Sequence, residues 1–223
     1  MKINRHLISV SKTAKYVTAG ILNGKTEAVW FLLHGYGQLA ENFIKKFEPL
    51  FSDRNFIVAP EALNKFYIKG FSGKVGATWM TTEDRENEIS DYINYLEKIY
   101  SGVIPQSLNS NLKINLLGFS QGTHTASRWI LNSKNKFDNL ILWGGSLTRN
   151  NELSGKLGKI KNAGLYFVFG KQDQFIDEKS IEIEKKRLEK LGLNYKLILF
   201  DGKHEIDVNA LSELIDLIKN NKK

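Results

Sequence analysis

The segment LLGFSQGTH, residues 116–124, places the pattern Gly-x-Ser-x-Gly around Ser120, directly after an apolar run. The run 114–117 predicts a strand and residues 123–131 predict a helix, so the serine falls in a sharp turn between the two. Such a turn holds the serine in a strained conformation, and glycines on both sides prevent side-chain collisions around it. Its hydroxyl would stand exposed at the carboxyl edge of a sheet, where open α/β folds bind ligands. This context favours a nucleophile over a serine that only caps a helix.

Short apolar runs alternate with amphipathic segments along the chain. The runs comprise residues 28–33, 56–59, 114–117, 140–143, 165–169 and 195–200. They are rich in β-branched and aromatic residues and mostly lack polar alternation, which is typical of central strands of a parallel sheet. Helical spacing is found in Ile89, Ile93, Leu96 and Tyr100, in residues 180–191 before Gly192, and in Leu211, Leu214, Ile215 and Ile218. This alternation predicts an α/β fold, with a mostly parallel central sheet and helices on both faces.

Two segments do not fit this alternation of strands and helices. Residues 7–17 alternate loosely and predict an antiparallel edge strand. Residues 61–80, EALNKFYIKGFSGKVGATWM, are glycine-bearing and rich in aromatic residues, without clear periodicity. Because loops this long in a compact domain are often functional, this segment is a candidate loop that covers the substrate, with a disordered insertion as the alternative.

The composition is that of a folded protein with a basic surface. The 223 residues, 42% of them hydrophobic, suit one domain that spans residues 1–223. The net charge of +8 arises from 26 Lys but only 6 Arg, and the basic residues are scattered. Because forked hydrogen bonds to bases and phosphates favour Arg, this pattern indicates a solvated surface and no nucleic-acid partner.

Several classes of protein are disfavoured by what the sequence lacks. No run approaches the roughly 18 apolar residues of a membrane helix, so we expect no integral membrane segment. Residues 1–12 lack the apolar region of a signal peptide, and we expect a cytoplasmic protein. The chain has no cysteine, no HExxH pattern and no glycine-rich phosphate loop, so we expect neither a metal nor a cofactor.

A serine nucleophile needs a base, and the base needs an orienting acid. In folds with this type of turn the chain order is Ser, then Asp or Glu, then His. His204 follows the run 195–200, so it is placed to reach a serine at the same edge of the sheet. Asp173 stands just past the run 165–169 and is the preferred acid, with Asp177 as its rival.

The other histidines and two further aspartates fit these roles less well. They are His6, His34, His124, Asp138 and Asp201. His6 precedes every motif, His34 belongs to a glycine loop, and His124 lies one helical turn past the serine. Asp138 precedes its strand and would lie at the wrong edge of the sheet. Asp201 lies three residues before His204 and more simply shapes the turn there.

The sequence FLLHGYGQ, residues 31–38, indicates an oxyanion hole. A glycine loop after an early strand lets the backbone approach a substrate, and the amide of Tyr36 can face its carbonyl oxygen. The second donor is the amide of Gln121, at the positive end of the predicted helix. Candidate side chains for the substrate pocket, each of which could equally be core, are Tyr36, Tyr67, Trp79, Phe175 and Ile176.

With these motifs the chain resembles an α/β-hydrolase, more narrowly the carboxylesterase and phospholipase group related to acyl-protein thioesterases. The matching pieces, in the family's order, are LLHGYG (32–37), APEA (59–62), GATW (76–79), GFSQG (118–122), GKQD (170–173) and GKH (202–204). The resemblance implies Ser120 as nucleophile, Asp173 as acid and His204 as base. It also implies oxyanion donors at the amides of Tyr36 and Gln121.

The expected activity is hydrolysis of carboxylic esters through an acyl-enzyme intermediate, with short or medium acyl chains. The alternatives are a thioesterase or lysophospholipase of the same family, or a non-catalytic binding protein on the same fold. The expected partner is a small-molecule acyl ester or thioester, and a homodimer is one arrangement open to the chain. Gln38, Thr123 and TWMT at 78–81 depart from the family's pattern, which bears on the pocket rather than on the triad.

Overall fold

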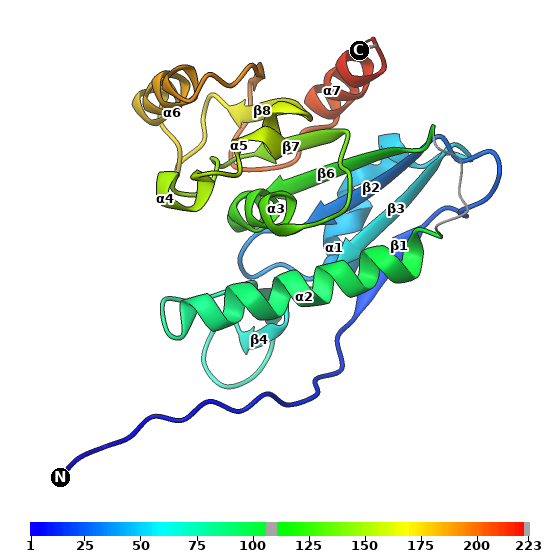
Figure 1. The fold of residues 1–223 in the computed structure, drawn as a ribbon. Helices are drawn as coiled ribbons and strands as arrows, with labels where there is room; N and C mark the ends of the chain where they lie inside the picture. Colours follow the sequence, from blue (N-terminus) through cyan, green and yellow to red (C-terminus); the bar gives the residue numbers. More distant parts are fainter. Residues whose placement is uncertain (106–110, 221–223) are drawn as a thin grey trace.

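The computed structural model describes residues 1–105 and 111–220, and its centre is a seven-stranded sheet (Figure 1). The strands are β1 (Tyr16–Ala19), β2 (Ala28–Leu33), β3 (Asn55–Pro60), β6 (Lys113–Phe119), β7 (Asn139–Trp143), β8 (Gly164–Gly170) and β9 (Lys196–Phe200). They lie in the order β1-β3-β2-β6-β7-β8-β9, and all pairs of neighbours are parallel except β1 with β3. Each predicted apolar run forms one of the parallel strands, which confirms the expected sheet.

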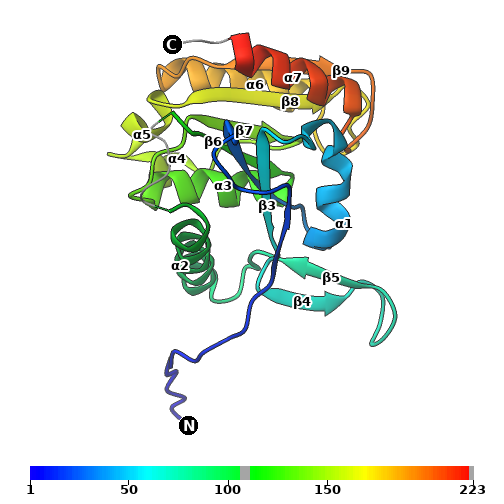
Figure 2. The same ribbon diagram turned by 90° about the vertical axis from the view of Figure 1, so that its right-hand side faces the viewer.

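Helices cover both faces of the sheet. They are α1 (Ala40–Ile44), the 3-10 helix η1 (Lys45–Leu50), α2 (Arg85–Val103), α3 (Gln121–Asn132), α4 (Asn150–Leu153), α5 (Leu157–Lys161), α6 (Glu178–Lys190) and α7 (Val208–Asn220). In β2, Phe31 and Leu33 face a hydrophobic cluster that α2 and α3 complete, whereas Trp30 and Leu32 face a second cluster with α1 and α7. Figure 2 shows α1 and α2 on opposite sides of the sheet. Burial on both faces explains why the strands read as continuous apolar runs.

The three predicted helical patterns are confirmed as α2, α6 and α7. After α6 the chain turns at Gly192, whose φ of +61° is the left-handed conformation that glycine adopts most easily at helix ends. The amide of Leu193 donates back to the Leu188 carbonyl oxygen at 3.0 Å and closes this end. The short helices α4 and α5 were not predicted, because four or five residues are too few to show helical periodicity.

The predicted edge strand at residues 7–17 is wrong for most of its length. Only β1 pairs with β3, and its register begins where Tyr16 lies opposite Pro60. One further hydrogen bond, from the Glu61 amide to the Lys15 carbonyl oxygen at 3.0 Å, follows beyond that pair. Residues 1–15 have no strand partner, since β3 ends at Pro60. A loosely alternating sequence therefore forms no strand here, because β3 offers it no backbone groups to pair with.

Residues 61–80 form an ordered β-hairpin rather than a structureless loop. Strands β4 (Asn64–Tyr67) and β5 (Val75–Thr78) pair antiparallel, and the turn closes where the Ile68 amide donates to the Lys74 carbonyl oxygen at 2.9 Å. The end of β5 is anchored to the body, because Gly37 N donates to Ala77 O at 2.9 Å. This anchoring fixes the hairpin beside the glycine loop at residues 34–37.

Glycines let α3 pack directly against the end of β2. A Cβ built on Gly122 would lie 2.2 Å from the Leu33 carbonyl oxygen, and one built on Gly118 would lie 2.2 Å from the Gly122 carbonyl oxygen. Both obstacles are backbone atoms, which cannot rotate away as a side chain can. The two glycines that flank the serine therefore set how closely the helix approaches the sheet.

We expect Gly122→Ala to lower the free energy of unfolding by about 2 kcal/mol, because α3 must move away from β2. Chemical denaturation would measure the change. Gly102→Ala is the matched control, since a Cβ there meets nothing within 4 Å and alanine is favoured over glycine in a helix by about 1 kcal/mol. Equal stability of the two variants would contradict the close packing described above.

Candidate active site

Ser120 lies in the turn between β6 and α3 with φ 54° and ψ −119°, which non-glycine residues rarely adopt. Its amide donates to the Trp143 carbonyl oxygen at 2.9 Å, and its own carbonyl oxygen accepts from the Thr123 amide at 3.0 Å. The Thr123 hydroxyl donates to the same oxygen at 2.7 Å. The structure thus contains the strained strand-to-helix turn that the sequence predicts, and Thr123 supports it.

Asp173 and His204 meet at the carboxyl edge of the sheet. Asp173 follows β8, and its Oδ2 lies 2.6 Å from His204 Nδ1. The other carboxylate oxygen accepts from the amides of Phe175 at 2.8 Å and Ile176 at 3.2 Å, which fixes the group. Since a carboxylate can only accept, the proton of this hydrogen bond belongs to His204 Nδ1, and in the neutral ring this tautomer has its lone pair on Nε2. Asp177, the rival acid, instead caps α6 by accepting from the Ser180 amide at 2.8 Å.

The His204 imidazole lies beside the serine turn. Its ring centroid is 4.9 Å from that of Phe119, the residue that precedes Ser120. A Cβ on Gly144, which follows β7, would lie 3.0 Å from His204 Cε1. The ends of β6, β7, β8 and β9 therefore bring the candidate nucleophile, base and acid to one edge of the sheet.

The two other histidines near this edge are in different environments. Burial, followed by the nearby Arg128, lowers the pKa of His124 to about 4, and its Nε2 lies 3.3 Å from Ser146 Oγ. Burial also lowers the pKa of His34, whose Nε2 accepts from the Ala62 amide at 3.0 Å. Both imidazoles are therefore neutral near pH 7 and take part in structural contacts.

Two backbone amides beside the serine are available as hydrogen-bond donors. In the glycine loop, Gly35 N donates to Gln38 Oε1 at 2.8 Å and Gly37 N donates to Ala77 O. Between them, the Tyr36 amide donates to no acceptor among the residues that the structure describes. The amide of Gln121 begins α3, where helix geometry leaves it without an intrahelical partner. A Cβ on Gly35 would lie 3.1 Å from Ser120 Cβ, so the loop lies directly against the serine.

The side chain of Gln121 connects the serine turn to the hairpin, a contact that sequence reasoning missed. Its Oε1 accepts from the Trp79 amide at 3.1 Å, and its Nε2 donates to the Met80 carbonyl oxygen at 3.0 Å. The Trp79 indole N–H in turn donates to the His34 carbonyl oxygen at 2.8 Å. No periodicity could have revealed these bonds, because they join three segments far apart in the sequence.

The predicted pocket residues have different environments. Phe175, 72% exposed, packs its ring edge-on against His204 at 4.9 Å, and Tyr36, 61% exposed, packs against Phe66 at 4.9 Å. Ile176 is partly buried against the core. Trp79 is only 1% exposed and belongs to the core, while Tyr67 lies exposed on the hairpin, paired with Val75. Of the exposed aromatic rings, that of Phe175 therefore lies against His204, whereas that of Tyr36 packs against the hairpin.

A partly buried ion-pair network lies behind the serine turn. Arg128 of α3 contacts Glu152 Oε2 through Nε at 2.6 Å, and Arg85 contacts Glu152 Oε1 at 2.9 Å. Burial alone would raise the pKa of Glu152, but hydrogen bonds from Arg128, Thr148 and Arg85 outweigh it and lower the pKa to about 2. Because Glu152 belongs to α4, the network ties the helix after the serine to the segment that follows β7.

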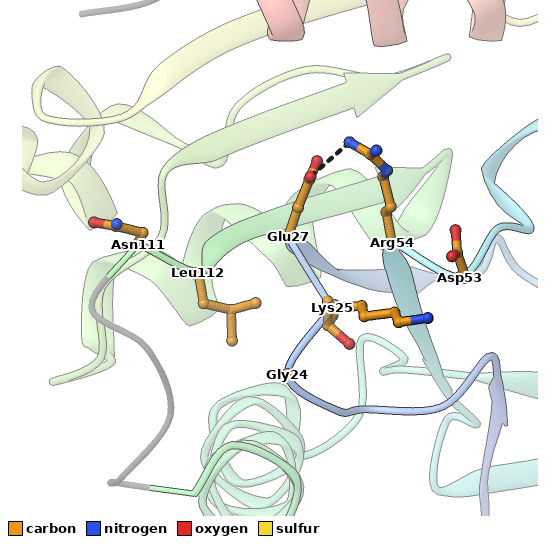
Figure 3. A pocket seen from close by; sticks show the side chains of 8 residues that line it. Gly24, Lys25, Glu27, Asp53, Arg54, Asn111 and Leu112 are labelled. Atoms are coloured by element: carbon orange, nitrogen blue, oxygen red, sulfur yellow. Dashed lines mark hydrogen bonds and ion pairs between the residues drawn. The ribbon is translucent and has the colours of Figure 1, made fainter.

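A separate pocket of about 380 Å³ lies at the opposite edge of the sheet (Figure 3). It is lined by Gly24, Lys25, Thr26, Glu27, Asp53, Arg54, Asn111 and Leu112. These residues precede β2, β3 and β6, where parallel strands begin, whereas Ser120 and His204 follow strands. An exposed ion pair between Arg54 and Glu27 at 2.7 Å crosses it. The pocket is therefore distinct from the candidate active site.

Within the part of the chain that the structure describes, no group of three or more acidic or histidine side chains could hold a metal ion. In the same residues, no helix is long and apolar enough to cross a bilayer.

The mostly parallel sheet, with a strained serine turn after one strand and an Asp–His contact after two others, is the α/β-hydrolase fold. The sequence model of the phospholipase/carboxylesterase family matches residues 21–222, and the chain belongs to this family. A comparison with curated proteins gave no match.

Several solved structures share the fold. Acyl-protein thioesterase 2 of Zea mays superposes with a TM-score of 0.71 at 16% identity, over 94% of this chain and 99% of that one. Esterase PE8 gives 0.70 at 20% identity, over 93% and 99% of the two chains. The Bacillus cereus carboxylesterase gives 0.65 at 14% identity, over 92% and 93%. Identities this low establish the fold alone.

We expect Glu152→Gln to lower the free energy of unfolding at pH 7 by about 2 kcal/mol, because Arg128 would stay buried without its counter-charge. The loss is smaller than for a fully buried pair, since the Glu152 side chain is 20% exposed. Glu86→Gln is the control: its carboxylate pairs with Arg85 but is 81% exposed, so stability should hardly change.

The loss of stability caused by Glu152→Gln should depend on pH. The folded-state pKa of Glu152 lies below the ordinary value of 4.5, so its contribution to stability is present above about pH 4.5 and is lost as the pH falls towards 2. Denaturation of both proteins across this range would show the difference between wild type and Glu152→Gln shrinking. A constant difference would contradict the role given to this carboxylate.

Proposed function

We propose that this protein is a serine hydrolase that cleaves carboxylic esters through an acyl-enzyme intermediate formed on Ser120. The observation that carries the proposal is the 2.6 Å contact between Asp173 Oδ2 and His204 Nδ1, beside a serine held at positive φ. Membership of the phospholipase/carboxylesterase family supports it. A protein that only binds a ligand has no need of an oriented imidazole next to a strained serine, so these features favour catalysis.

In the proposed acylation step, His204 Nε2 accepts the hydroxyl proton of Ser120 while Oγ attacks the acyl carbonyl carbon. Asp173 retains the imidazole tautomer and stabilises the imidazolium that forms. The amides of Tyr36 and Gln121 donate to the tetrahedral oxyanion, and losing such a donor typically costs on the order of 3 kcal/mol. The imidazolium then protonates the leaving alcohol as its bond to carbon breaks.

Deacylation repeats these roles with water as the nucleophile. The imidazole of His204 accepts a proton from water, whose oxygen attacks the acyl carbon. Collapse of the second tetrahedral intermediate releases the carboxylic acid and returns the proton to Ser120 Oγ. Apart from the ester and one water molecule, both halves of the reaction use only the chain's own residues.

The acyl chain that we propose is short or medium in length. The exposed ring of Phe175 provides apolar surface against His204, and the exposed ring of Tyr36 lies in the glycine loop, while Trp79 is buried and adds none. A thioester or a lysophospholipid presents the same carbonyl, so the same residues would act on it. Comparing kcat/KM over esters of increasing acyl length, a thioester and a lysophospholipid would separate these substrate classes.

We expect a fluorophosphonate to form a single covalent adduct on the native protein, at Ser120, with loss of fluoride. Intact mass and peptide mapping would show it, and Ser120→Ala should remain unmodified. Ser146→Ala is the control, because Ser146 also lies beside a histidine, at 3.3 Å from His124 Nε2, yet should be labelled like wild type. An adduct on Ser146, or none on folded native protein, would contradict the proposed nucleophile.

We expect Asp173→Asn to lower kcat by roughly a thousandfold or more, since the amide no longer holds the productive imidazole tautomer. Asp177→Asn should retain nearly full activity, because Asp177 only caps α6. Steady-state hydrolysis of a chromogenic ester would measure both. The reverse ranking of the two variants would assign the acid to Asp177.

A further inference from the structure

Residues 1–15 extend away from the body of the protein (Figures 1 and 2). They form neither helix nor strand. Their large apolar side chains, Ile3, Leu7, Ile8 and Val10, are 70–88% exposed. Four such side chains in one short segment form an apolar surface that nothing in the described chain covers, and surfaces of this kind commonly mark an interaction.

The order of residues in this segment is that of a basic amphipathic helix. At about 100° per residue, Ile3, Leu7, Val10 and Ala14 fall on one stripe. The cations Lys2, Arg5, Lys12 and Lys15 lie on the other side of the same helix, and no acidic residue precedes Glu27. Ile8 lies off the stripe. A narrow apolar stripe opposite four cations is the pattern of a helix that lies in a lipid interface.

Contacts with the body strongly fix only the C-terminal end of the segment, at Lys15, which we call its root. At the root, the Lys15 carbonyl oxygen accepts from the Glu61 amide at 3.0 Å and from the Tyr95 hydroxyl at 2.6 Å. Further out, Arg5 pairs with Glu83 and Asp84, each at 3.3 Å, in exposed contacts. Pairs exposed to this extent contribute about 0–1 kcal/mol, so the segment can leave them for a stronger partner.

Further positive charge lies at the root. Lys12, Lys15 and Lys65 line a pocket of about 430 Å³ with the buried carboxylate of Glu61. That carboxylate pairs with Lys15 at 3.4 Å and with Lys65 at 2.9 Å, which leaves more cations than anions there. Of these three cations, Lys12 and Lys15 belong to the segment, and Lys65 is the one that the folded body adds beside them.

We propose that residues 1–15 bind an anionic lipid surface as an amphipathic helix. In water an isolated helix of this length is marginal, particularly with β-branched and short polar residues, which agrees with the extended form seen here. At a bilayer, the apolar stripe is buried among acyl chains and the lysines approach anionic headgroups. The inference goes beyond ester hydrolysis and does not depend on it.

The position of the segment determines which part of the protein would face the bilayer. Arg5 contacts Glu83 and Asp84 in the loop before α2, and the same loop begins at Met80, whose carbonyl oxygen binds the Gln121 side chain. The segment therefore runs past the loop that adjoins the serine turn. Because Lys15 is bound to Glu61 and Tyr95 of the body, a docked protein would keep the surface around these two residues close to the bilayer.

Vesicle sedimentation with the Ser120→Ala variant of the whole 223-residue chain tests the proposal, since binding is then independent of turnover. We expect binding to vesicles of phosphatidylcholine with phosphatidylglycerol but not to phosphatidylcholine alone. Binding should weaken as salt is added, and circular dichroism should show a gain of helix with the anionic vesicles.

Matched variants test the helical geometry. Leu7→Ser should lower the vesicle partition constant by about tenfold, whereas Ile8→Ser, at a position that is more exposed (88% against 70%) but off the stripe, should lower it by about twofold or less. Unchanged thermal unfolding would show that each variant still folds. No binding to anionic vesicles at low salt, equal losses for both variants, or tighter binding to nucleic acid than to vesicles would overturn the proposal.

Discussion

The close approach of α3 to the ends of β2 and β6 is the constraint on which the candidate site depends. Gly122 meets the Leu33 carbonyl oxygen where any side chain would collide, and Gly118 meets the carbonyl of Gly122 in the same way. With the helix this close, the turn before it leaves Ser120 at positive φ and puts the Gln121 amide next to the serine. One packing requirement, met by two glycines, thus places both a candidate nucleophile and a candidate oxyanion donor.

The second donor comes from a different segment, so something must hold the two in register. Strand β5 and the residues after it do this. Ala77 N donates to the Gln38 carbonyl oxygen at 3.2 Å, and the Trp79 amide donates to the Gln121 side chain at 3.1 Å. The hairpin at residues 61–80, expected to cover the substrate, therefore has an anchored end that joins the glycine loop to the serine turn. Donors fixed before the reaction need no reorganisation when charge develops, which is what electrostatic stabilisation requires.

Sequence reasoning succeeded where the signal was local and failed where a distant partner decided the outcome. Strands buried on both faces are continuous apolar runs, so β2, β3 and β6 to β8 could be read directly. The hairpin could not, since β4 and β5 have four residues each and Gly73 and Gly76 interrupt the pattern. Trp79 could be pocket or core until its partner, the His34 carbonyl oxygen, was known.

Gln38 illustrates the same limit from the other direction. It departs from the family's pattern, and the sequence assigned that departure to the pocket. In the structure its side chain accepts from the Gly35 amide at 2.8 Å, which shapes the loop that carries Tyr36. The amide oxygen of Gln38 thus supplies the acceptor that closes this loop. A departure in sequence therefore need not be a departure in geometry.

Arginine and lysine contribute differently to the net charge of +8. Arg85 and Arg128 share Glu152, and Arg187 pairs with Glu184 while donating to the Leu147 carbonyl oxygen at 3.3 Å. Planar guanidinium groups suit such multiple contacts, which organise the chain after β7. Most of the remaining positive charge is on lysine, whose hydrated ammonium groups attract anions over about 10 Å without selecting among them. Selectivity for an anionic surface must then come from arrangement, and residues 1–15 provide one, because their cations oppose an apolar stripe.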